Sequence, residues 1–294
     1  MQFGAIFPQM DGALSPAGIR AWVLGVEALG FDYVLVYEHV LGVAPGSRPD
    51  WPHLTRDTPF HEPLTLIAHL AALVPGLGFA TGVLVLPQRQ TALVAKQAAA
   101  ADIFCGGRLR LGVGVGRIEA EYEALAQPFA RRGRRCDEQL ALLRRLWTEE
   151  TVDFAGEFDR IDRAGINPLP VQRPIPLWIG GDSAAAMRRA GALGDGWMPH
   201  GRPGPGVAER AGAMLGIARQ AGRPEGAVGI EGRVTLRDLE PREWWTELER
   251  WATMPGVTHL GIDTHGLGCA SGGDHLAALG AFVGGIGGLG RRGP

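Results

Sequence analysis

The chain has 294 residues, a net charge of -2, and 46% hydrophobic against 20% charged residues, which is the composition of an ordinary globular protein. This charge argues against a nucleic-acid partner, and no apolar run reaches the ~18 residues that a membrane span needs. The three cysteines show no metal-ligand spacing and the N-terminus carries no charged leader, so we expect a reduced, cytoplasmic protein without a metal site.

Short apolar runs alternate with longer helical patterns along the whole chain. The short runs predict strands because they are continuously apolar, as buried parallel strands are. The predicted strands are 2–7, 33–36, 78–85, 109–115, 177–179, 196–198, 228–234 and 259–262. The predicted helices are 16–29, 63–73, 91–104, 119–125 with 131–147, 184–193, 208–221, 241–254 and 273–283.

Eight strand–helix units in fewer than 300 residues predict an α/β fold, a single (β/α)8 barrel domain over residues 1–294. The rival is a doubly wound open sheet, because GVGVG at 112–116 resembles a dinucleotide-binding turn. That fold places its glycines in the first strand–helix unit, with an acidic residue about 20 residues further on. Here the glycines close about the fourth strand and a basic helical segment follows, so the barrel is favoured.

Two long connections interrupt the repeat, at 41–61 and at 148–175, where TVDFAGEFDRI reads as a hairpin. Long connections after barrel strands gather at the C-terminal face, where active sites are built. We expect both insertions at that face, and the first to shape a pocket for a small-molecule substrate.

Tyr37, Glu38 and His39 follow the second strand directly and are expected at the barrel mouth. A carboxylate beside an imidazole suits proton transfer near neutral pH, which makes Glu38 and His39 candidate catalytic residues. Neighbours in an extended segment point in opposite directions, so Glu38 could support the site without binding His39. The alternative is a histidine that only anchors the loop.

The third strand ends with a hydroxyl and a bare backbone in Thr81, Gly82 and Val83. An irregular backbone at Gly82–Val83 could carry a planar cofactor ring. The alternative at this position is a plain β-bulge or a packing glycine.

The glycines at 112, 114 and 116 remove every second side chain from the fourth strand, so a flat ligand or a phosphate could lie against the backbone. Arg117 follows and could neutralise a phosphate, although such an arginine is more often solvated. A second glycine turn comprises Gly180, Gly181, Asp182 and Ser183, between a strand and a helix. Its helix N-terminus and hydroxyl suit a phosphate, and a plain helix cap is the alternative.

Five segments taken together resemble the bacterial luciferase-like flavin and deazaflavin enzymes, over residues 1 to about 200. They are EALGFDYVLVYEHV, TGVLVLP, LVAKQAAAADIFCGGRLRLGVGVG, PFARRGRRCDEQLALLRRLW and PLPVQRPIPLWIGGDSAAAMRRAGALGDGW. The resemblance implies a barrel that holds coenzyme F420, or alternatively FMN, at the C-terminal ends of its strands.

The resemblance also implies roles for the candidate residues. Gly82–Val83 would form a non-proline cis peptide under the ring, and His39 would sit beside it and move a proton. Glu38 replaces the aspartate that is common in relatives. The cofactor's chain would be flanked by Gly114, Val115, Gly116 and Arg117, and its phosphate would be bound by Gly180, Gly181, Asp182 and Ser183.

We therefore expect an F420-dependent oxidoreductase that transfers a hydride to or from a small organic substrate. An FMN-dependent luciferase-like monooxygenase is the first alternative, and a non-catalytic flavin- or F420-binding protein is the second. Relatives are often dimers, so the resemblance allows a homodimer.

Overall fold

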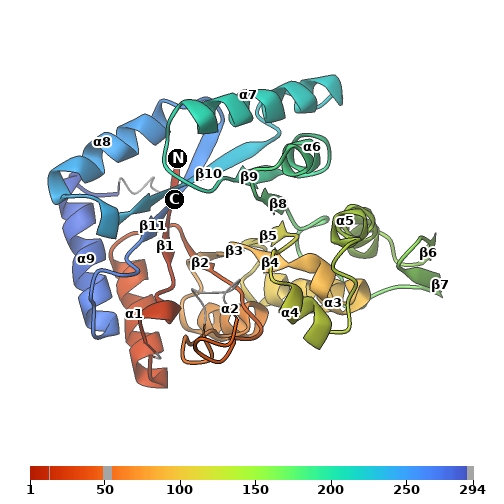
Figure 1. Ribbon diagram of the computed structural model, residues 1–294, viewed down its shortest axis with the longest axis horizontal. Coiled ribbons are helices and arrows are strands. Elements are labelled where there is room, and N and C mark those ends of the chain that lie inside the picture. Colours follow the sequence, from red (N-terminus) through yellow and green to blue (C-terminus); the bar gives the residue numbers. More distant parts are fainter. Residues whose placement is uncertain (13, 49–54, 290–294) are drawn as a thin grey trace.

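The computed structural model describes residues 1–12, 14–48 and 55–289, and within these ranges parallel strands close into a barrel wrapped by helices (Figure 1). Pairing of β1 with β2 and β11, and of β3 with β5, closes the ring. Around it the strands are β1 (Gln2–Ile6), β2 (Tyr33–Val36), β3 (Gly78–Thr81) with β4 (Leu84–Val85), β5 (Leu109–Gly114), β8 (Leu177–Gly180), β9 (Gly196–Met198), β10 (Gly229–Thr235) and β11 (Val257–Asp263). The predicted (β/α)8 barrel is confirmed.

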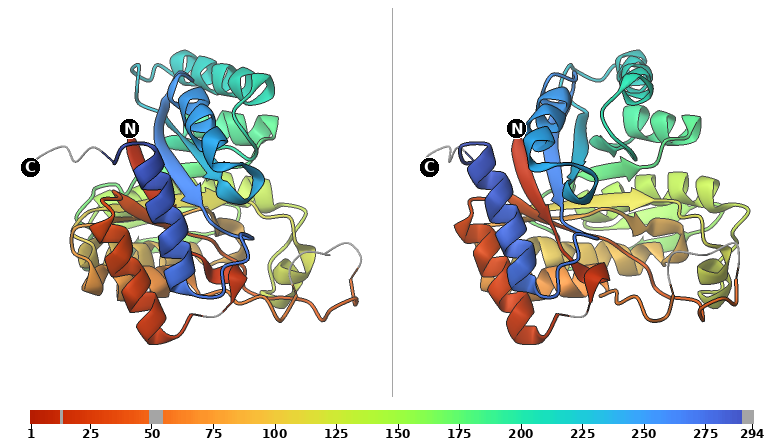
Figure 2. Two further views of the ribbon diagram at one scale, coloured as in Figure 1. Left: turned by 90° about the vertical axis from the view of Figure 1, so that its left-hand side faces the viewer. Right: turned by 60° about the vertical axis from the view of Figure 1, so that its left-hand side comes forward.

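Helices cover the outside of the barrel, and the last of them packs beside the first (Figure 2). Several begin with proline at their first position, where the missing N–H costs nothing. The helices are α1 (Pro16–Ala28), α2 (Pro63–Leu73), α3 (Thr91–Phe104), α4 (Glu119–Ala124), α5 (Arg132–Thr148), α6 (Ala184–Ala192), α7 (Pro205–Gln220), α8 (Pro241–Ala252) and α9 (Gly272–Gly285). Within the described residues, none is both long and apolar enough to cross a bilayer.

The side chains of each strand divide between two cores, because successive residues point to opposite faces. On β2, Val34 and Val36 belong to the outer core between strands and helices, whereas Tyr33 and Leu35 point into the barrel. The alternation explains why the strand is buried along its whole length. Every second residue of each strand therefore points into the barrel interior, and those at the C-terminal ends lie at the barrel mouth.

A polar cluster fills the barrel near the N-terminal ends of the strands. The Tyr33 hydroxyl donates to Oε1 of Glu231 at 2.7 Å, and Nη1 of Arg110 donates to Oε2 of Glu231 at 2.8 Å. The Arg110 guanidinium lies between the rings of Tyr33 and Trp178, 4.4 and 4.6 Å from their centroids. This cluster, called the floor below, pairs its buried charges and closes the barrel beneath the mouth.

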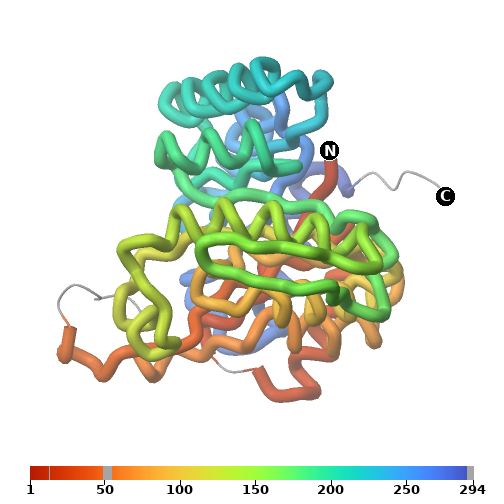
Figure 3. The backbone as a smooth tube through the Cα atoms, turned by 90° about the vertical axis from the view of Figure 1, so that its right-hand side faces the viewer, coloured from red at the N-terminus to blue at the C-terminus, as the bar shows by residue number. Residues whose placement is uncertain are grey.

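The two insertions lie in different places. The connection after β2 runs beside α4, and its residues 49–54 lie outside the described part of the chain. The hairpin of β6 (Val152–Ala155) and β7 (Arg160–Ala164) lies instead along the outer side of α5 (Figure 3). The hairpin follows a helix and precedes a strand, so it starts from the N-terminal end of the barrel. The expectation that this second insertion lies at the C-terminal face is therefore wrong.

The hairpin is fixed to α5 by one carboxylate. Glu138 accepts the backbone N–H groups of Glu157, Phe158 and Asp159 at 2.6, 2.9 and 2.8 Å. Three consecutive donors on one side chain hold the turn against the helix. The hairpin therefore packs against the outer side of α5, away from the barrel mouth.

Candidate functional site

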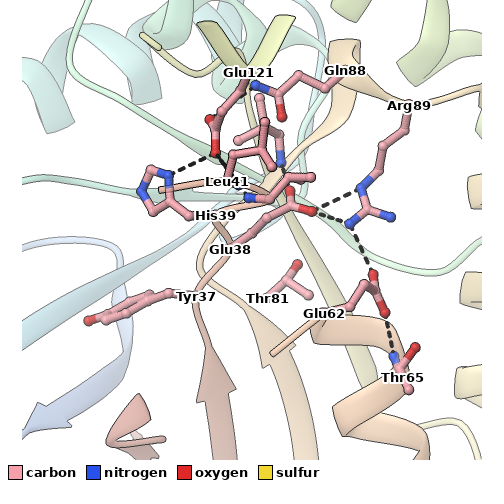
Figure 4. A network of polar contacts seen from close by, with 12 residues as sticks. Tyr37, Glu38, His39, Leu41, Glu62, Thr65, Thr81, Gln88, Arg89 and Glu121 are labelled. Carbon is pink, nitrogen blue, oxygen red and sulfur yellow. Dashed lines mark hydrogen bonds and ion pairs between the residues drawn. The ribbon is translucent and has the colours of Figure 1, made fainter. Parts of the chain in front are cut away.

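His39 leaves the end of β2 and contacts a buried carboxylate on α4 (Figure 4). Its Nδ1 lies 3.2 Å from Oε1 of Glu121, and the same oxygen accepts the backbone N–H of Val40 at 2.9 Å. The second oxygen of Glu121 accepts the side-chain amide of Gln88 at 3.2 Å. Glu121 therefore holds both the imidazole ring and the main chain of the loop that follows.

The Glu121 carboxyl is ionised at neutral pH. Burial on its own raises the pKa of Glu121, but the hydrogen bonds from His39, Gln88 and Val40 outweigh it, and the pKa is lowered. An ionised carboxylate only accepts hydrogen bonds, so Nδ1 of His39 carries the proton between them. Any proton transfer by this ring then runs through Nε2.

Sequence reasoning missed Glu121. Three glutamates alternate in EAEYEA over 119–124, and nothing in that pattern distinguishes one from the others. Only the packing of α4 separates them, because it buries Glu121 and leaves Glu119 and Glu123 exposed. Such a tertiary contact across about 80 residues of sequence has no local signal.

Glu38 points away from His39 and is also buried (Figure 4). Its carboxylate accepts the backbone N–H of Val85 at 2.5 Å and both Nε and Nη2 of Arg89, with Nε at 3.0 Å. Arg89 also reaches Glu62 at 2.9 Å, at the N-terminus of α2. Glu38 thus connects β2, β4 and α2, and the structure brings His39 together with Glu121 and not with Glu38.

Val83 lies between two glycines of the barrel wall. The peptide bond between Gly82 and Val83 is cis, as the resemblance implied. A Cβ added at Gly114 would lie 2.6 Å from Cγ2 of Val83, and one added at Gly180 would lie 2.6 Å from its Cγ1. The glycines of β5 and β8 therefore make room for the Val83 side chain at the barrel mouth.

The other candidates of this region have separate places. The Thr81 hydroxyl donates to the carbonyl of Gly112 at 2.6 Å, so it ties β3 to β5. Val115 is half-buried against the outer core, and Gly116 adopts a positive φ of 60° that suits glycine. Arg117 is exposed and makes no hydrogen bond or ion pair with any residue that the structure describes.

The segment 180–183 forms a helix N-terminus with unengaged backbone donors. Gly181 has a positive φ of 110°, and Ser183 caps α6 by accepting the N–H of Ala186 at 3.2 Å. Within the described chain, the N–H groups of Ser183, Ala184 and Ala185 have no acceptor. Such donors at the positive end of a helix suit an anion, most often a phosphate.

Asp182 stands beside these donors, and its negative charge would repel an anion. Two basic side chains approach it, with Nδ1 of His200 at 3.0 Å and Nε of Arg210 at 3.6 Å. The guanidinium of Arg210 offsets part of the charge of Asp182. The helix N-terminus therefore remains suitable for a phosphate.

Two hollows lie near these residues. The central cavity, at the barrel mouth, is lined by Val83 and Gly180 on one side and by Arg233 on the other, and it measures about 450 Å³ together with the space that opens to solvent. That volume is within the usual range of ligand pockets, so it can take a small ligand. His39 lines a second hollow, of about 580 Å³ counted in the same way, with residues 40–42 and 55–60, and its ring lies edge-on to Phe60 at 5.1 Å. No three potential ligand side chains gather as a metal site in the described ranges.

Comparison with known proteins gives consistent likenesses. The family model described as luciferase-like monooxygenase matches residues 1–255. The FMNH2-dependent dimethylsulfone monooxygenase of Pseudomonas putida is 30% identical over 217 residues, 72% of this chain and 59% of that protein. The F420-dependent glucose-6-phosphate dehydrogenase of Nakamurella multipartita is 31% identical over 191 residues, 62% of this chain and 52% of that protein.

The chain spans about half the length of the curated relatives it matches. Among solved structures, an F420-dependent secondary alcohol dehydrogenase in complex with an F420–acetone adduct superposes with a TM-score of 0.77 at 16% identity, covering 97% of this chain and 98% of that one. At this identity the superposition shows a shared fold.

Proposed function

Because the chain belongs to the luciferase-like monooxygenase family, we propose that it is an oxidoreductase that uses coenzyme F420 to transfer a hydride to or from a small organic substrate. The observation that carries the proposal is the arrangement around the barrel mouth. Val83 forms one wall, the donors of α6 adjoin it through Gly180, and His39 stands at the end of β2. F420 supplies the hydride chemistry when bound, and the protein supplies binding and proton management.

The residues at the mouth fit a cofactor of this kind. A ring lying across the opening would meet Val83, because Gly114 and Gly180 leave its side chain standing at the surface of the cavity. A phosphate would meet the N–H groups at the start of α6. Arg117, exposed beyond β5, is a further cation for an anionic chain.

His39 is the residue proposed to move the proton. Glu121 fixes its ring through Nδ1, so Nε2 gives or takes the proton. Glu38 acts indirectly, because it anchors the segment that carries His39 to β4 and Arg89. The His39 side chain is 25% exposed and lies beside Phe60, so a substrate in the second hollow would approach it there.

An FMN-dependent monooxygenase is the second candidate. The FMNH2-dependent relative matches 72% of this chain, a larger share than the 62% matched by the F420-dependent relative. Both cofactors carry a planar ring and a phosphate-bearing chain, so the same residues would hold either.

Fluorescence titration of the purified protein with F420, FMN and riboflavin tests these proposals. We expect F420 to bind tightly and riboflavin, which lacks the phosphate, to bind about tenfold more weakly than FMN. Tight binding of FMN without F420 would establish the second candidate. Binding of neither would overturn both, and binding without turnover on a panel of oxidisable and reducible substrates would indicate a carrier.

A single substitution probes the phosphate contact. Ala184 is the first residue of α6, where proline is tolerated and removes one N–H, and Ser183 before it is extended at φ −72° and ψ 157°. Ala184→Pro should weaken F420 and FMN by roughly tenfold, as expected for a lost hydrogen bond to a charged group, and leave riboflavin unchanged. Ala184→Ser keeps the N–H and is the control. Equal effects on the binding of FMN and riboflavin would show that the phosphate does not bind at the N-terminus of α6.

A further inference from the structure

Arg233 brings a positive charge into the central cavity, and no described residue accepts a hydrogen bond from its guanidinium. It lies on β10 two residues after Glu231, so both side chains point into the barrel. Glu231 is engaged by Tyr33 and Arg110 in the floor. The Arg233 guanidinium lies 4.9 Å from the centroid of the Tyr37 ring, and it makes no hydrogen bond or ion pair anywhere in the described chain.

Asp263, an acidic group that interacts with Arg233, already has hydrogen-bond partners. Asp263 gives Oδ1 to the backbone N–H of His265 at 3.0 Å and to its Nδ1 at 2.6 Å. Its Oδ2 receives the Tyr37 hydroxyl at 3.5 Å, a long hydrogen bond. His265 stacks on Tyr37 with ring centroids 5.8 Å apart, so the Tyr37 ring lies between an imidazole and a guanidinium.

The Arg233 guanidinium and the Tyr37 hydroxyl are both hydrogen-bond donors at neutral pH. Burial lowers the pKa of Arg233, but Tyr37, Asp263 and Glu231 outweigh it and the pKa is raised. Burial is also the main cause that raises the pKa of Tyr37, so its hydroxyl keeps its proton. In the open cavity, water supplies acceptors to this guanidinium, and a ligand carboxylate can replace that water with stronger, charge-assisted hydrogen bonds.

The position of Arg233 separates it from the proposed cofactor wall. β10 is four strands from β3 in either direction around the ring, so Arg233 and Val83 face each other across the mouth. Between them the lining includes the apolar side chains of Ile6, Leu35 and Met198, with Glu231 and His200 as further polar groups. A ligand that fits has an apolar body and one anionic end.

We propose that Arg233 binds the carboxylate of the substrate and so selects organic acids that carry an apolar body. A planar guanidinium pairs with a planar carboxylate through two parallel hydrogen bonds. This assignment rests on the proposed function, because it assumes that the cofactor's phosphate binds at α6. The anion that binds Arg233 is then the carboxylate of the substrate.

Calorimetric titration with matched pairs of acid and amide tests the assignment without turnover. The probes are benzoate against benzamide, hexanoate against hexanamide, and phenylacetate against phenylacetamide, with and without saturating cofactor. We expect at least one acid to bind about tenfold more tightly than its amide. Arg233→Met should abolish that preference, and Arg233→Lys should keep part of it. Arg237→Met removes an exposed charge just beyond the same strand and is the control.

Two further measurements separate this proposal from its rivals. Arg233→Met should bind F420 and FMN as the parent does; a matching loss of cofactor affinity would give the guanidinium to the cofactor and overturn the proposal. Its unfolding temperature should fall only slightly, because the contact with the Tyr37 ring and the attraction of Asp263 are lost but no protein hydrogen bond is; a large fall would indicate a structural role and also overturn it. No acid preference in any pair would overturn it too, whereas failure to bind either cofactor would leave this result standing and refute the proposed function.

Discussion

Oε1 of Glu121 lies 3.2 Å from Nδ1 of His39, and this single oxygen also accepts the main-chain N–H of the residue after it. The contact joins α4 to the end of β2, two segments about 80 residues apart. The orientation of the histidine therefore depends on how α4 packs, and the connection that begins at Val40 depends on the same carboxylate. Side chain and loop respond together to any change at Glu121.

His39→Ala should lower kcat by roughly 10²- to 10⁴-fold, the usual contribution of a positioned acid–base group. Cofactor affinity should change little, because His39 lines the neighbouring hollow and not the central cavity. Steady-state kinetics and cofactor titration measure the two quantities. His69→Ala, on the exposed side of α2, is the control. Equal losses of turnover and cofactor affinity would contradict the proton-transfer role.

Glu121→Gln should destabilise the protein by about 1–3 kcal/mol at neutral pH, the cost of weakening hydrogen bonds to a buried charged group. The folded pKa of Glu121 lies below its ordinary value of 4.5, so its ionised form stabilises the fold above that pH. The stabilisation is lost as the pH falls through the lowered value. Urea unfolding across pH should therefore show the parent and variant converging in acid. Glu123→Gln, exposed on the same helix, should show no such pH-dependent difference.

Gly114→Ala should cost about 1–3 kcal/mol of stability and weaken cofactor binding, because the new Cβ would lie 2.6 Å from Val83. Adding Val83→Ala should recover part of the lost stability by removing the opposing methyl groups. Thermal unfolding and cofactor titration are the measurements. Gly284→Ala on α9 meets nothing within 4 Å and should be neutral or stabilising. A Gly114→Ala protein as stable as the parent would show that Val83 and the strands around it shift to accommodate the new methyl group.

Arg110→Met should destabilise the protein by roughly 3–5 kcal/mol, because it leaves Glu231 charged and buried in the floor. The double variant with Glu231→Gln should be more stable than Arg110→Met alone, since the amide oxygen can still accept from Tyr33. Urea unfolding of the three proteins measures the difference. No recovery in the double variant would show that the floor depends on the packing of Arg110 and not on its charge.

Elements with strong local signals were predicted closely from the sequence. The strand expected at 177–179 is observed as β8, one residue longer, and β2 has the expected bounds. The strand expected over 78–85 is divided by the turn at Gly82–Val83 into β3 and β4. The helix expected from 208 begins at Pro205, because proline at the first helical position was not counted as a start.

The site was less predictable than the fold. The position of His39 follows from the strand before it, but its partner is chosen by the packing of α4. The glycines at 114 and 180 suggested contact with a ligand, whereas their immediate neighbour is Val83. The sequence did not indicate a role for Arg233. That its guanidinium has no hydrogen-bond acceptor in the described chain becomes visible only when the surrounding residues are placed. Which side chains meet across the barrel depends on how the ring of strands closes. A short stretch of sequence does not contain that information.

The floor of Tyr33, Arg110, Trp178 and Glu231 has a kinetic consequence. Because it lies beneath the central cavity, we expect molecules to enter that cavity from the mouth. Cofactor, substrate and product would then share one entrance, and a substrate bound at Arg233 would lie deeper than a ring spread across the opening. The substrate would therefore have to bind before the cofactor covers the mouth. Product inhibition patterns test this order of binding.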